Sequence, residues 1–219
     1  MTEPQSSVQP ETIFRSPKKR GRVMVLLSGR GSNFRAIHDA VLAGKIDGEI
    51  VLVFSNKEDA AGLRTARERG LETMFINPKL YPEKIDYDKE IVREAQKRQV
   101  DLICLAGYMK VLTPYFCEAF RNRIMNIHPA LLPSFPGLHV QQKAIDWGVR
   151  WSGCTTHFVA AEVDMGPIIL QAAVPVLQDD TEESLADRIL VEEHKIYPES
   201  VRLFFEGRLE VRGRRVFIR

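Results

Sequence analysis

The sequence has few cysteines, no long hydrophobic run and no N-terminal signal. Its 219 residues include only three cysteines, Cys104, Cys117 and Cys154, and these lack the spacing of a metal site. An odd number of such cysteines is typical of a reducing compartment, so a cytoplasmic protein is expected. No apolar segment approaches the roughly 20 residues of a membrane span, and the N-terminus lacks the apolar core of a signal peptide. We therefore expect neither a metal ion nor a membrane partner.

An excess of one charge is also missing. Lys and Arg total 31 and Asp and Glu 29, which gives a net charge of +2, and the two signs are interspersed. Such a chain shows no sign of a polyanion-binding surface, so no nucleic-acid partner is expected. One basic cluster, Lys18-Lys19-Arg20 with Arg22, is interpreted as the solvated flank of a tail, with a nucleic-acid arm as the alternative.

Two regions differ in composition. Residues 1–20 are rich in Pro, Ser, Gln and charge, and they bury too little apolar surface to order themselves. We expect a disordered or loosely ordered tail there. Residues 21–219 are enough for one sizeable core, so a single domain is expected, either as a monomer or in a homodimer.

Apolar strand-like runs alternate with helical patterns along this domain. Strands are predicted over residues 22–27, 49–55, 72–76, 100–106, 123–127, 151–159 and 168–176. Helices are predicted after residue 33, over 59–69, 86–99 and 140–147, and from about 180 to 207, before a C-terminal hairpin. Strands that are apolar on both faces need helices on both sides. The pattern predicts an α/β fold with a doubly wound, mostly parallel twisted sheet, of the Rossmann-like kind.

Local signals predict how several helices begin and what one histidine does. Asp59 is expected to cap the helix over 59–69, and Asp180 with Glu183 to cap the last long helix. Pro198 is expected to bend that helix, because proline removes a helical hydrogen bond. His38 has no partner in view and is expected at the surface.

The stretch from Ile124 to His139, I-M-N-I-H-P-A-L-L-P-S-F-P-G-L-H, places polar residues at the end of a strand. Alternate residues of a strand share a face, so Asn126 and His128 point the same way. Pro129 has no N–H and ends the ladder directly after His128. Ligands bind at such strand ends in α/β sheets. A capped strand end with a hydrogen-bonded histidine is the alternative.

A carboxylate follows in A-A-E-V-D-M-G-P, residues 160–167, where Gly166 and Pro167 mark a loop around Asp164. An amide, an imidazole and a carboxylate together can polarise a carbonyl, stabilise an oxyanion and move a proton. The carboxylate reaches Asn126 and His128 only if the neighbouring strands pair. No cysteine or serine is placed as a covalent nucleophile.

The turn S-G-R-G-S-N, residues 28–33, joins the first strand to the first helix. Its backbone N–H groups and the helix dipole favour a phosphate. A dinucleotide site is the alternative, but Phe34 replaces the third glycine of that motif and the P-loop lysine is absent.

These segments resemble the folate-dependent formyltransferases. In the family's order, the matching pieces are S-G-R-G-S-N (28–33), A-G-Y-M-K-V-L (106–112), N-I-H-P-A-L-L-P-S-F-P-G-L-H (126–139), H-F-V-A-A-E-V-D-M-G-P-I-I-L-Q (157–171) and E-H-K-I-Y-P (193–198). The resemblance implies a catalytic domain that uses 10-formyltetrahydrofolate as formyl donor and the primary amine of phosphoribosylglycinamide as acceptor. A formyltetrahydrofolate hydrolase, a different acceptor, and a non-catalytic folate- or nucleotide-binding module are the alternatives.

The resemblance also implies roles for single residues. The catalytic residues are Asn126, His128 and Asp164, with His157 as a supporting residue beside them. The nucleotide-binding residues are Gly31, Ser32, Asn33 and Glu193. The folate-binding residues are Lys84, Met109, Lys110, Val111, Leu112, Val159, Ala160, Ala161, Glu162 and Val163. Leu190 departs from the family, in which many members place a polar residue beside the substrate.

The implied mechanism is direct transfer without a metal. The neutral amine attacks the formyl carbon, and the oxyanion of the tetrahedral intermediate accepts hydrogen bonds from Asn126 and protonated His128. Asp164 favours the protonated imidazole and relays the amine proton toward the leaving folate nitrogen. Glu193 falls on a buried helix face, where a carboxylate needs a partner. The resemblance supplies ribose hydroxyls as that partner, in place of a protein group.

Overall fold

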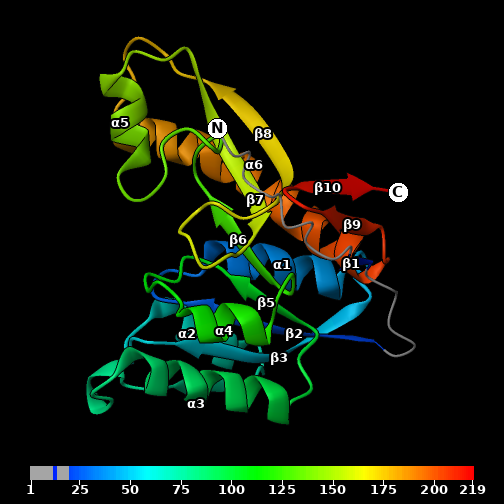
Figure 1. Cartoon of the computed structure of the whole chain (residues 1–219). Coiled ribbons are helices and arrows are strands. Elements are labelled where there is room, and N and C mark those ends of the chain that lie inside the picture. The colour runs from blue at the N-terminus through cyan, green and yellow to red at the C-terminus, as the bar shows by residue number, and fades with distance from the viewer. Residues whose placement is uncertain (1–11, 14–19) are drawn as a thin grey trace, which may run out of the picture.

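The computed structural model describes residues 12–13 and 20–219. Within them, ten strands form one sheet in the order β1-β9-β10-β8-β7-β6-β5-β2-β3-β4 (Figure 1). The strands are β1 (Thr12–Ile13), β2 (Gly21–Leu27), β3 (Gly48–Ser55), β4 (Thr73–Phe75), β5 (Leu102–Leu105), β6 (Ile124–His128), β7 (Trp151–Phe158), β8 (Ile168–Pro175), β9 (Leu209–Arg212) and β10 (Arg215–Ile218). Strands β2 to β6 pair in parallel, whereas β7 is antiparallel to both β6 and β8.

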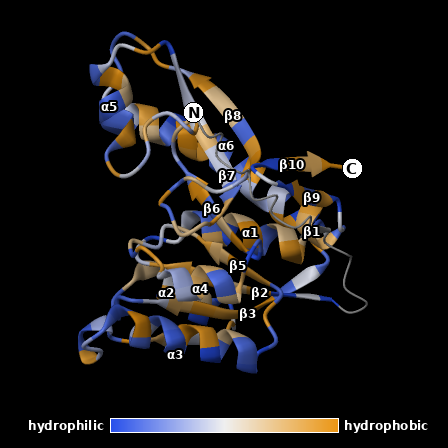
Figure 2. Ribbon diagram, in the orientation of Figure 1, coloured by the Kyte–Doolittle hydropathy of each residue, from blue (hydrophilic) through white to orange (hydrophobic). Residues whose placement is uncertain are grey.

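Helices cover both faces of this sheet. They are α1 (Ser32–Leu42), α2 (Ala61–Glu68), the 3-10 helix η1 (Pro78–Leu80), α3 (Lys84–Lys97), α4 (Pro114–Ala119), α5 (Val140–Asp146) and α6 (Glu182–Phe205). Along β2, Val23 and Val25 pack into a core with α1, α2 and α6, while Met24 and Leu26 pack into a second core with α3 and α4. Figure 2 shows the hydrophobic strands between the two helix layers. The doubly wound α/β fold is confirmed.

The order of the strands opens a crevice beside β2. The chain adds β3 and β4 on one side of β2, then returns to add β5 and β6 on the other. The turns that leave the carboxyl ends of β2 and β5 therefore lie side by side, which is where open α/β sheets bind ligands. Ser28 joins them, because its N–H donates to Gly107 O at 3.0 Å and its Oγ accepts from Met109 N at 2.8 Å.

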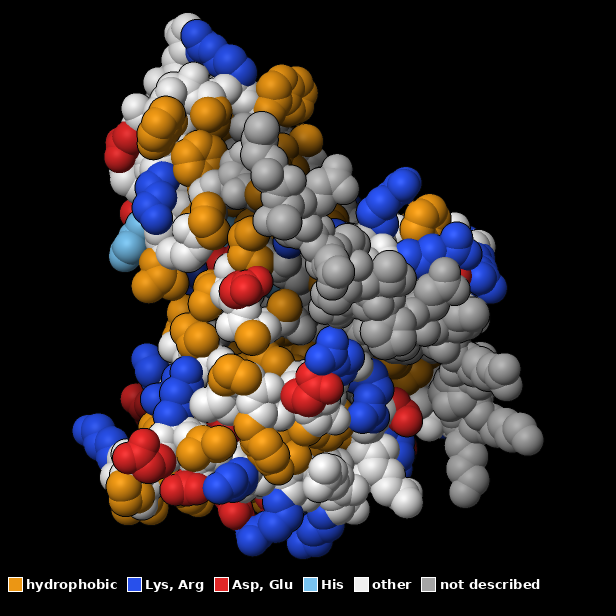
Figure 3. Space-filling view, viewed as in Figure 1, with side chains coloured by type: hydrophobic (Ala, Val, Ile, Leu, Met, Phe, Trp, Pro, Cys, Tyr) orange, Lys and Arg blue, Asp and Glu red, His pale blue; other side chains and the backbone are white. Residues whose placement is uncertain are grey.

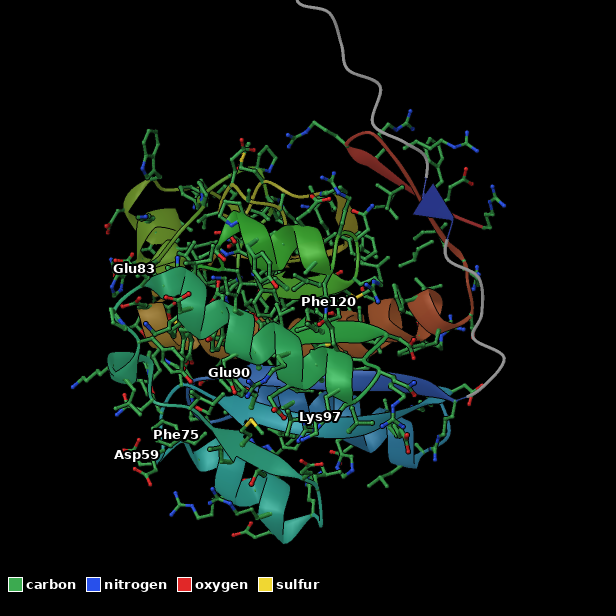
Figure 4. The ribbon with its side chains drawn as sticks, turned by 60° about the horizontal axis from the view of Figure 1, so that its bottom comes forward. Asp59, Phe75, Glu83, Glu90, Lys97 and Phe120 are labelled. Atoms are coloured by element: carbon green, nitrogen blue, oxygen red, sulfur yellow. The ribbon has the colours of Figure 1, made fainter. Side chains whose placement is uncertain are left out.

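Two helix caps differ from prediction. Helix α2 begins after Ala60 and has no side-chain cap, and Asp59 is exposed (Figure 4). A distant segment accepts a hydrogen bond from its first turn, since Gly62 N donates to Gly29 O at 2.9 Å. Helix α6 is capped by Thr181, which forms a capping box with Ser184.

Asp180 and Glu183 therefore do not form the predicted capping pair. The Asp180 carboxylate instead accepts two hydrogen bonds from Arg188, at 2.7 and 2.8 Å. Helix α6 runs without interruption through Pro198 from Glu182 to Phe205.

His38 is buried and not at the surface. Its ring stacks on Phe34 with centroids 6.0 Å apart, and its Nδ1 lies 3.1 Å from Arg69 Nη1. Burial, followed by the Arg69 charge, lowers the pKa of His38. The isolated sequence position gave no sign of Arg69, because the contact spans 31 residues.

Strands from the two ends of the described sequence lie at one edge of the sheet. β9 and β10 form the predicted hairpin, and β1 pairs with β9 through Thr12 opposite Val211 and Ile13 opposite Glu210. Of the predicted disordered or loosely ordered tail, residues 1–11 and 14–19 lie outside the described residues. No helix among the described residues has the length and apolar character of a membrane span.

Candidate active site

Asn126 and His157 face each other across the pairing of β6 with β7. The register places them directly opposite, and Asn126 Nδ2 lies 3.3 Å from His157 Nε2. His157 Nδ1 lies 3.0 Å from Phe158 O, which needs the ring proton on Nδ1 and leaves Nε2 as acceptor for the amide. Burial lowers the pKa of His157, in keeping with a neutral ring. His157 therefore fixes the orientation of the Asn126 amide.

His128 ends β6 and contacts two acceptors. Its Nε2 lies 2.9 Å from Phe135 O, in the proline-rich loop that follows the strand. Its Nδ1 lies 3.4 Å from Asp164 Oδ2, and the two side chains are only 5% and 9% exposed. The Phe135 contact satisfies one ring nitrogen, so the other is directed at the carboxylate.

Asp164 lies in the loop between β7 and β8, which folds back over the end of β6. Its φ of 57° is in the left-handed region, which Asp tolerates better than most residues. The carboxylate also accepts a hydrogen bond from Gly137 N at 2.9 Å, and its Oδ1 lies 3.7 Å from His157 Nε2. One carboxylate thus contacts both histidines and the loop after β6.

Close backbone packing holds the Asp164 loop at its base. A Cβ on Gly166 would lie 1.7 Å from Phe158 O, so only glycine fits there. Phe158 N also donates to Pro167 O at 2.9 Å. The Gly-Pro pair that marks the loop in the sequence is what closes it.

An apolar pocket of about 480 Å³ opens beside these side chains. Its polar wall includes Asn126, His128, His157 and Asp164. Its apolar wall comes from the end of β5 and the turn after it, the loop after β6 and the loop after β7, as Leu105, Met109, Val111, Leu112, Leu138, Val159, Ala160, Ala161 and Val163. Figure 3 shows hydrophobic side chains gathered on this face, over the loop after β7 and around α4. A pocket of this kind suits a flat heterocycle.

The glycine-rich turn forms a second pocket, the turn pocket, of about 410 Å³. Gly31 has φ 72° and lies at the N-cap of α1, and a Cβ there would meet Gly62 Cα at 3.0 Å. The first N–H groups of α1 point out of the helix end and suit an anion. Lys57 and Arg30 also line the turn pocket.

Asn33 and Glu193 meet on the inner wall of the turn pocket. Asn33 Nδ2 donates to Glu193 Oε2 at 2.7 Å, across 160 residues of sequence. The expectation that Glu193 meets no other protein group is therefore wrong. Burial raises the pKa of Glu193, and the bond from Asn33 opposes that shift. Asn33 Oδ1 is buried without a hydrogen-bond partner among the described residues, so it is left to accept from a ligand.

The two pockets adjoin. Gly107, Met109, Pro129 and Gln141 line both of them, and Pro129 directly follows His128. A group held in the turn pocket and a group held in the apolar pocket can therefore meet next to His128.

Most of the residues singled out from the sequence lie at these pockets. Gly31, Ser32, Asn33 and Glu193 line the turn pocket, as does the divergent Leu190. Of the ten residues assigned to the folate, Lys84 and Glu162 line neither pocket. Lys84 is exposed on the first turn of α3. Glu162 is also exposed, and its carbonyl accepts a hydrogen bond from Met165 N.

Sequence reasoning missed several supporting groups. Phe135 O and Gly137 N, which contact His128 and Asp164, are backbone atoms and leave no side-chain signal. Gly137, in a proline-rich loop, was the one available sign of a special backbone position. Gln141, which lines both pockets, carries no motif. Among the described residues, no group of three or more His, Cys, Asp or Glu side chains is arranged to hold a metal ion.

The fold and this site are those of an α/β enzyme with two adjoining pockets. Comparison with known proteins identifies its family. Residues 21–201 match the formyl transferase family, so the chain belongs to it. It is 42% identical over 189 residues to the phosphoribosylglycinamide formyltransferase of Escherichia coli strain K12. The aligned region covers 86% of this chain and 89% of that protein.

Two further proteins are similar to this chain. The chain is 46% identical over 192 residues to the trifunctional purine biosynthetic protein adenosine-3 of Drosophila melanogaster, and it spans only 14% of that protein's length. The crystal structure of glycinamide ribonucleotide transformylase 1 from Symbiobacterium toebii superposes with a TM-score of 0.90 at 51% identity, covering 92% of this chain and 95% of that one.

Proposed function

We propose that the protein is a phosphoribosylglycinamide formyltransferase. It would transfer the formyl group of 10-formyltetrahydrofolate to the primary amine of phosphoribosylglycinamide, giving formylglycinamide ribonucleotide and tetrahydrofolate in purine biosynthesis. The observation that carries this proposal is the adjoining of an anion-suited turn pocket and an apolar pocket next to His128. The bacterial relative of similar length carries the same activity in its name.

Each substrate has a pocket whose chemistry fits it. The flat ring system of the folate suits the apolar pocket, where the Met109 carbonyl and backbone groups of Lys110 and Leu112 would offer fixed donors and acceptors. The phosphate of the acceptor suits the N–H groups of Gly31, Ser32 and Asn33 at the start of α1. The buried Asn33 Oδ1 and Glu193 then accept hydrogen bonds from the sugar hydroxyls.

The polar wall of the apolar pocket supplies donors to the oxyanion. When the amine attacks the formyl carbon, a C–N bond forms and the formyl oxygen becomes negatively charged. The Asn126 amide has two N–H groups, and His157 engages one of them, which leaves the other for the oxyanion. His128 Nδ1 adds a second donor when the ring is protonated. Its 3.4 Å separation from Asp164 is longer than a normal hydrogen bond, so the N–H can be shared between the carboxylate and an oxyanion beside it.

Two acceptors lie beside the His128 ring, Phe135 O at Nε2 and the Asp164 carboxylate at Nδ1. An imidazolium would donate at both nitrogens. Asp164 also carries the proton that the attacking nitrogen releases to the departing folate nitrogen, whose bond to carbon breaks. These side chains supply oxyanion donors and a proton carrier, so the proposed transfer is direct.

A spectrophotometric formyl-transfer assay tests the proposal. Purified protein is mixed with 10-formyltetrahydrofolate and with phosphoribosylglycinamide, a different amine, or water alone as acceptor. We expect tetrahydrofolate to form fast only with phosphoribosylglycinamide, in a one-to-one ratio with its formylated product. Equal rates with water alone would identify a hydrolase and overturn the proposal, and binding without turnover would identify a non-catalytic module.

A further inference from the structure

A groove runs between α1 and α6 and begins at the turn pocket. Its volume is about 1080 Å³. Its α1 wall is one face of the helix, since the lining positions recur at spacings of three and four: residues 32, 35, 36, 39, 40 and 43. Its α6 wall comes from the segment between His194 and Arg202. Ser32 lines both the turn pocket and this α1–α6 groove, so the two spaces border the same residue.

The α1–α6 groove carries more positive charge than its carboxylates neutralise. Five Lys and Arg side chains line it against two carboxylates. Three of the five are held in ion pairs by acidic side chains of α1 and α6. The other two, Arg35 and Lys45, are exposed and form no ion pair within residues 20–219. These two charges are therefore available to a mobile anion.

Arg35 and Lys45 mark the near and far ends of the α1–α6 groove. Arg35 lies one helical turn after Ser32, whereas Lys45 lies beyond the end of α1 at Leu42. At about 1.5 Å per residue, α1 is roughly 15 Å long from Ser32 to Leu42, and Lys45 lies beyond its far end. The positive field at the near end acts on a neighbour, because burial and then the Arg35 charge lower the pKa of His194.

We propose that the α1–α6 groove is an anion-guiding surface that captures the phosphate of the acceptor and leads it to the N-terminus of α1. The inference rests on the proposed function, because that function supplies the phosphorylated acceptor. A concave surface with an excess of one sign of charge raises the local concentration of an opposite ligand and speeds association by about 10- to 1,000-fold. Its effect falls on the association rate constant, since neither Arg35 nor Lys45 lines the turn pocket.

Ionic strength distinguishes the effects of the charges at the two ends of the α1–α6 groove. The Debye length is about 30 Å at 0.01 M ionic strength and about 8 Å at 0.15 M. Lys45, beyond the far end of this roughly 15 Å helix, therefore acts on the turn only at low salt. Arg35, one turn away, still acts at 0.15 M.

The test measures binding rates of phosphoribosylglycinamide over immobilised protein by surface plasmon resonance. The variants are Arg35→Gln, Lys45→Gln and their combination. The matched control is Lys79→Gln with Lys97→Gln, which removes two exposed charges that lie outside the α1–α6 groove (Figure 4 labels Lys97 on α3). Ribosylglycinamide, which lacks the phosphate, is the matched ligand, and circular dichroism confirms that each variant is folded.

We expect the combined variant to lower the association rate constant about threefold or more at 0.01 M salt relative to the control, with an unchanged dissociation rate. At 0.15 M only the Arg35→Gln loss should remain, and at about 0.5 M none. Equal association rates in variant and control, or an equal loss with ribosylglycinamide, would overturn the inference alone. Absence of any binding to the unaltered protein would overturn the proposed function, and this inference with it.

Discussion

Replacing Asp164 with Asn removes one negative charge from the cleft and keeps the shape of the side chain. The amide oxygen of Asn can still accept from Gly137 N, which lies 2.9 Å from the carboxylate. What is lost is the electrostatic partner of His128, at 3.4 Å. At an effective dielectric constant of about 20, two unit charges at that separation interact by about 5 kcal/mol. Solvent screens this pair little, because the side chains are only 5% and 9% exposed.

That energy is an upper limit on the effect. Every 1.36 kcal/mol of lost transition-state stabilisation is about tenfold in rate, so loss of the pair corresponds to at most roughly 4,000-fold. Loss of general acid/base help is typically about 100- to 10,000-fold. We therefore expect Asp164→Asn to lower kcat by at least about 100-fold, with little change in either KM, because the interaction acts in the transition state.

Single-turnover formyl transfer, followed spectrophotometrically, gives the rate, and steady-state titration gives both Michaelis constants. Asp146→Asn is the control, since it removes an exposed carboxylate on α5 that accepts a hydrogen bond from Gln142. It should keep full activity. A variant of Asp164 that retained more than about a tenth of normal turnover would show that the carboxylate is only a loop residue.

Three further outcomes are expected. Gly31→Val places a side chain at φ 72°, 3.0 Å from Gly62 Cα, and should raise the acceptor KM at least about tenfold but not the folate KM. Equal damage to both constants would refute this. Glu193→Gln should weaken acceptor binding in calorimetry but leave folate binding intact. Burial raises the pKa of Glu193, so ionising this carboxyl lowers the stability of the folded protein as pH rises above 4.5. The Glu193→Gln variant should therefore unfold at pH 7 at a temperature no lower than the parent. A clearly lower unfolding temperature would contradict this prediction. Tyr197→Phe removes buried hydrogen bonds to Leu105 O and Met125 O, at 3.1 and 2.9 Å, and should cost about 1–3 kcal/mol in urea unfolding. A loss below about 0.5 kcal/mol would show that these bonds add nothing.

Local patterns were enough to predict the layers of the fold and the polar end of β6. The alternation of side chains along a strand places Asn126 and His128 on one face whatever the rest of the chain does. The glycine-rich turn and the Gly-Pro pair after Asp164 likewise act through their own backbone. These features depend on residues close together in the sequence, and the structure has them where they were expected.

Features that depend on distant segments could not be predicted. The carbonyl of Gly29 meets the start of α2, so the sequence around Asp59 gave the wrong cap. Glu193 contacts Asn33 across 160 residues, and no local pattern distinguishes that contact from a ligand. A strand of only two residues, Thr12–Ile13, has no periodicity to detect. The side of α3 on which Lys84 lies depends on how that helix packs, which spacing alone does not give.

The hydrogen bonds of Ser28 couple the walls of the two pockets. Besides its contacts with Gly107 and Met109, its hydroxyl donates to Asn56 Oδ1 at 2.6 Å, directly after β3. Ser28 thus links the turns that follow β2, β3 and β5. A displacement of the apolar-pocket wall is therefore coupled to a displacement of the turn pocket. A defect at Ser28 is therefore shared between two ligands, so Ser28→Ala should alter both Michaelis constants where Gly31→Val alters one. A change in only one constant would mean that the three turns move independently.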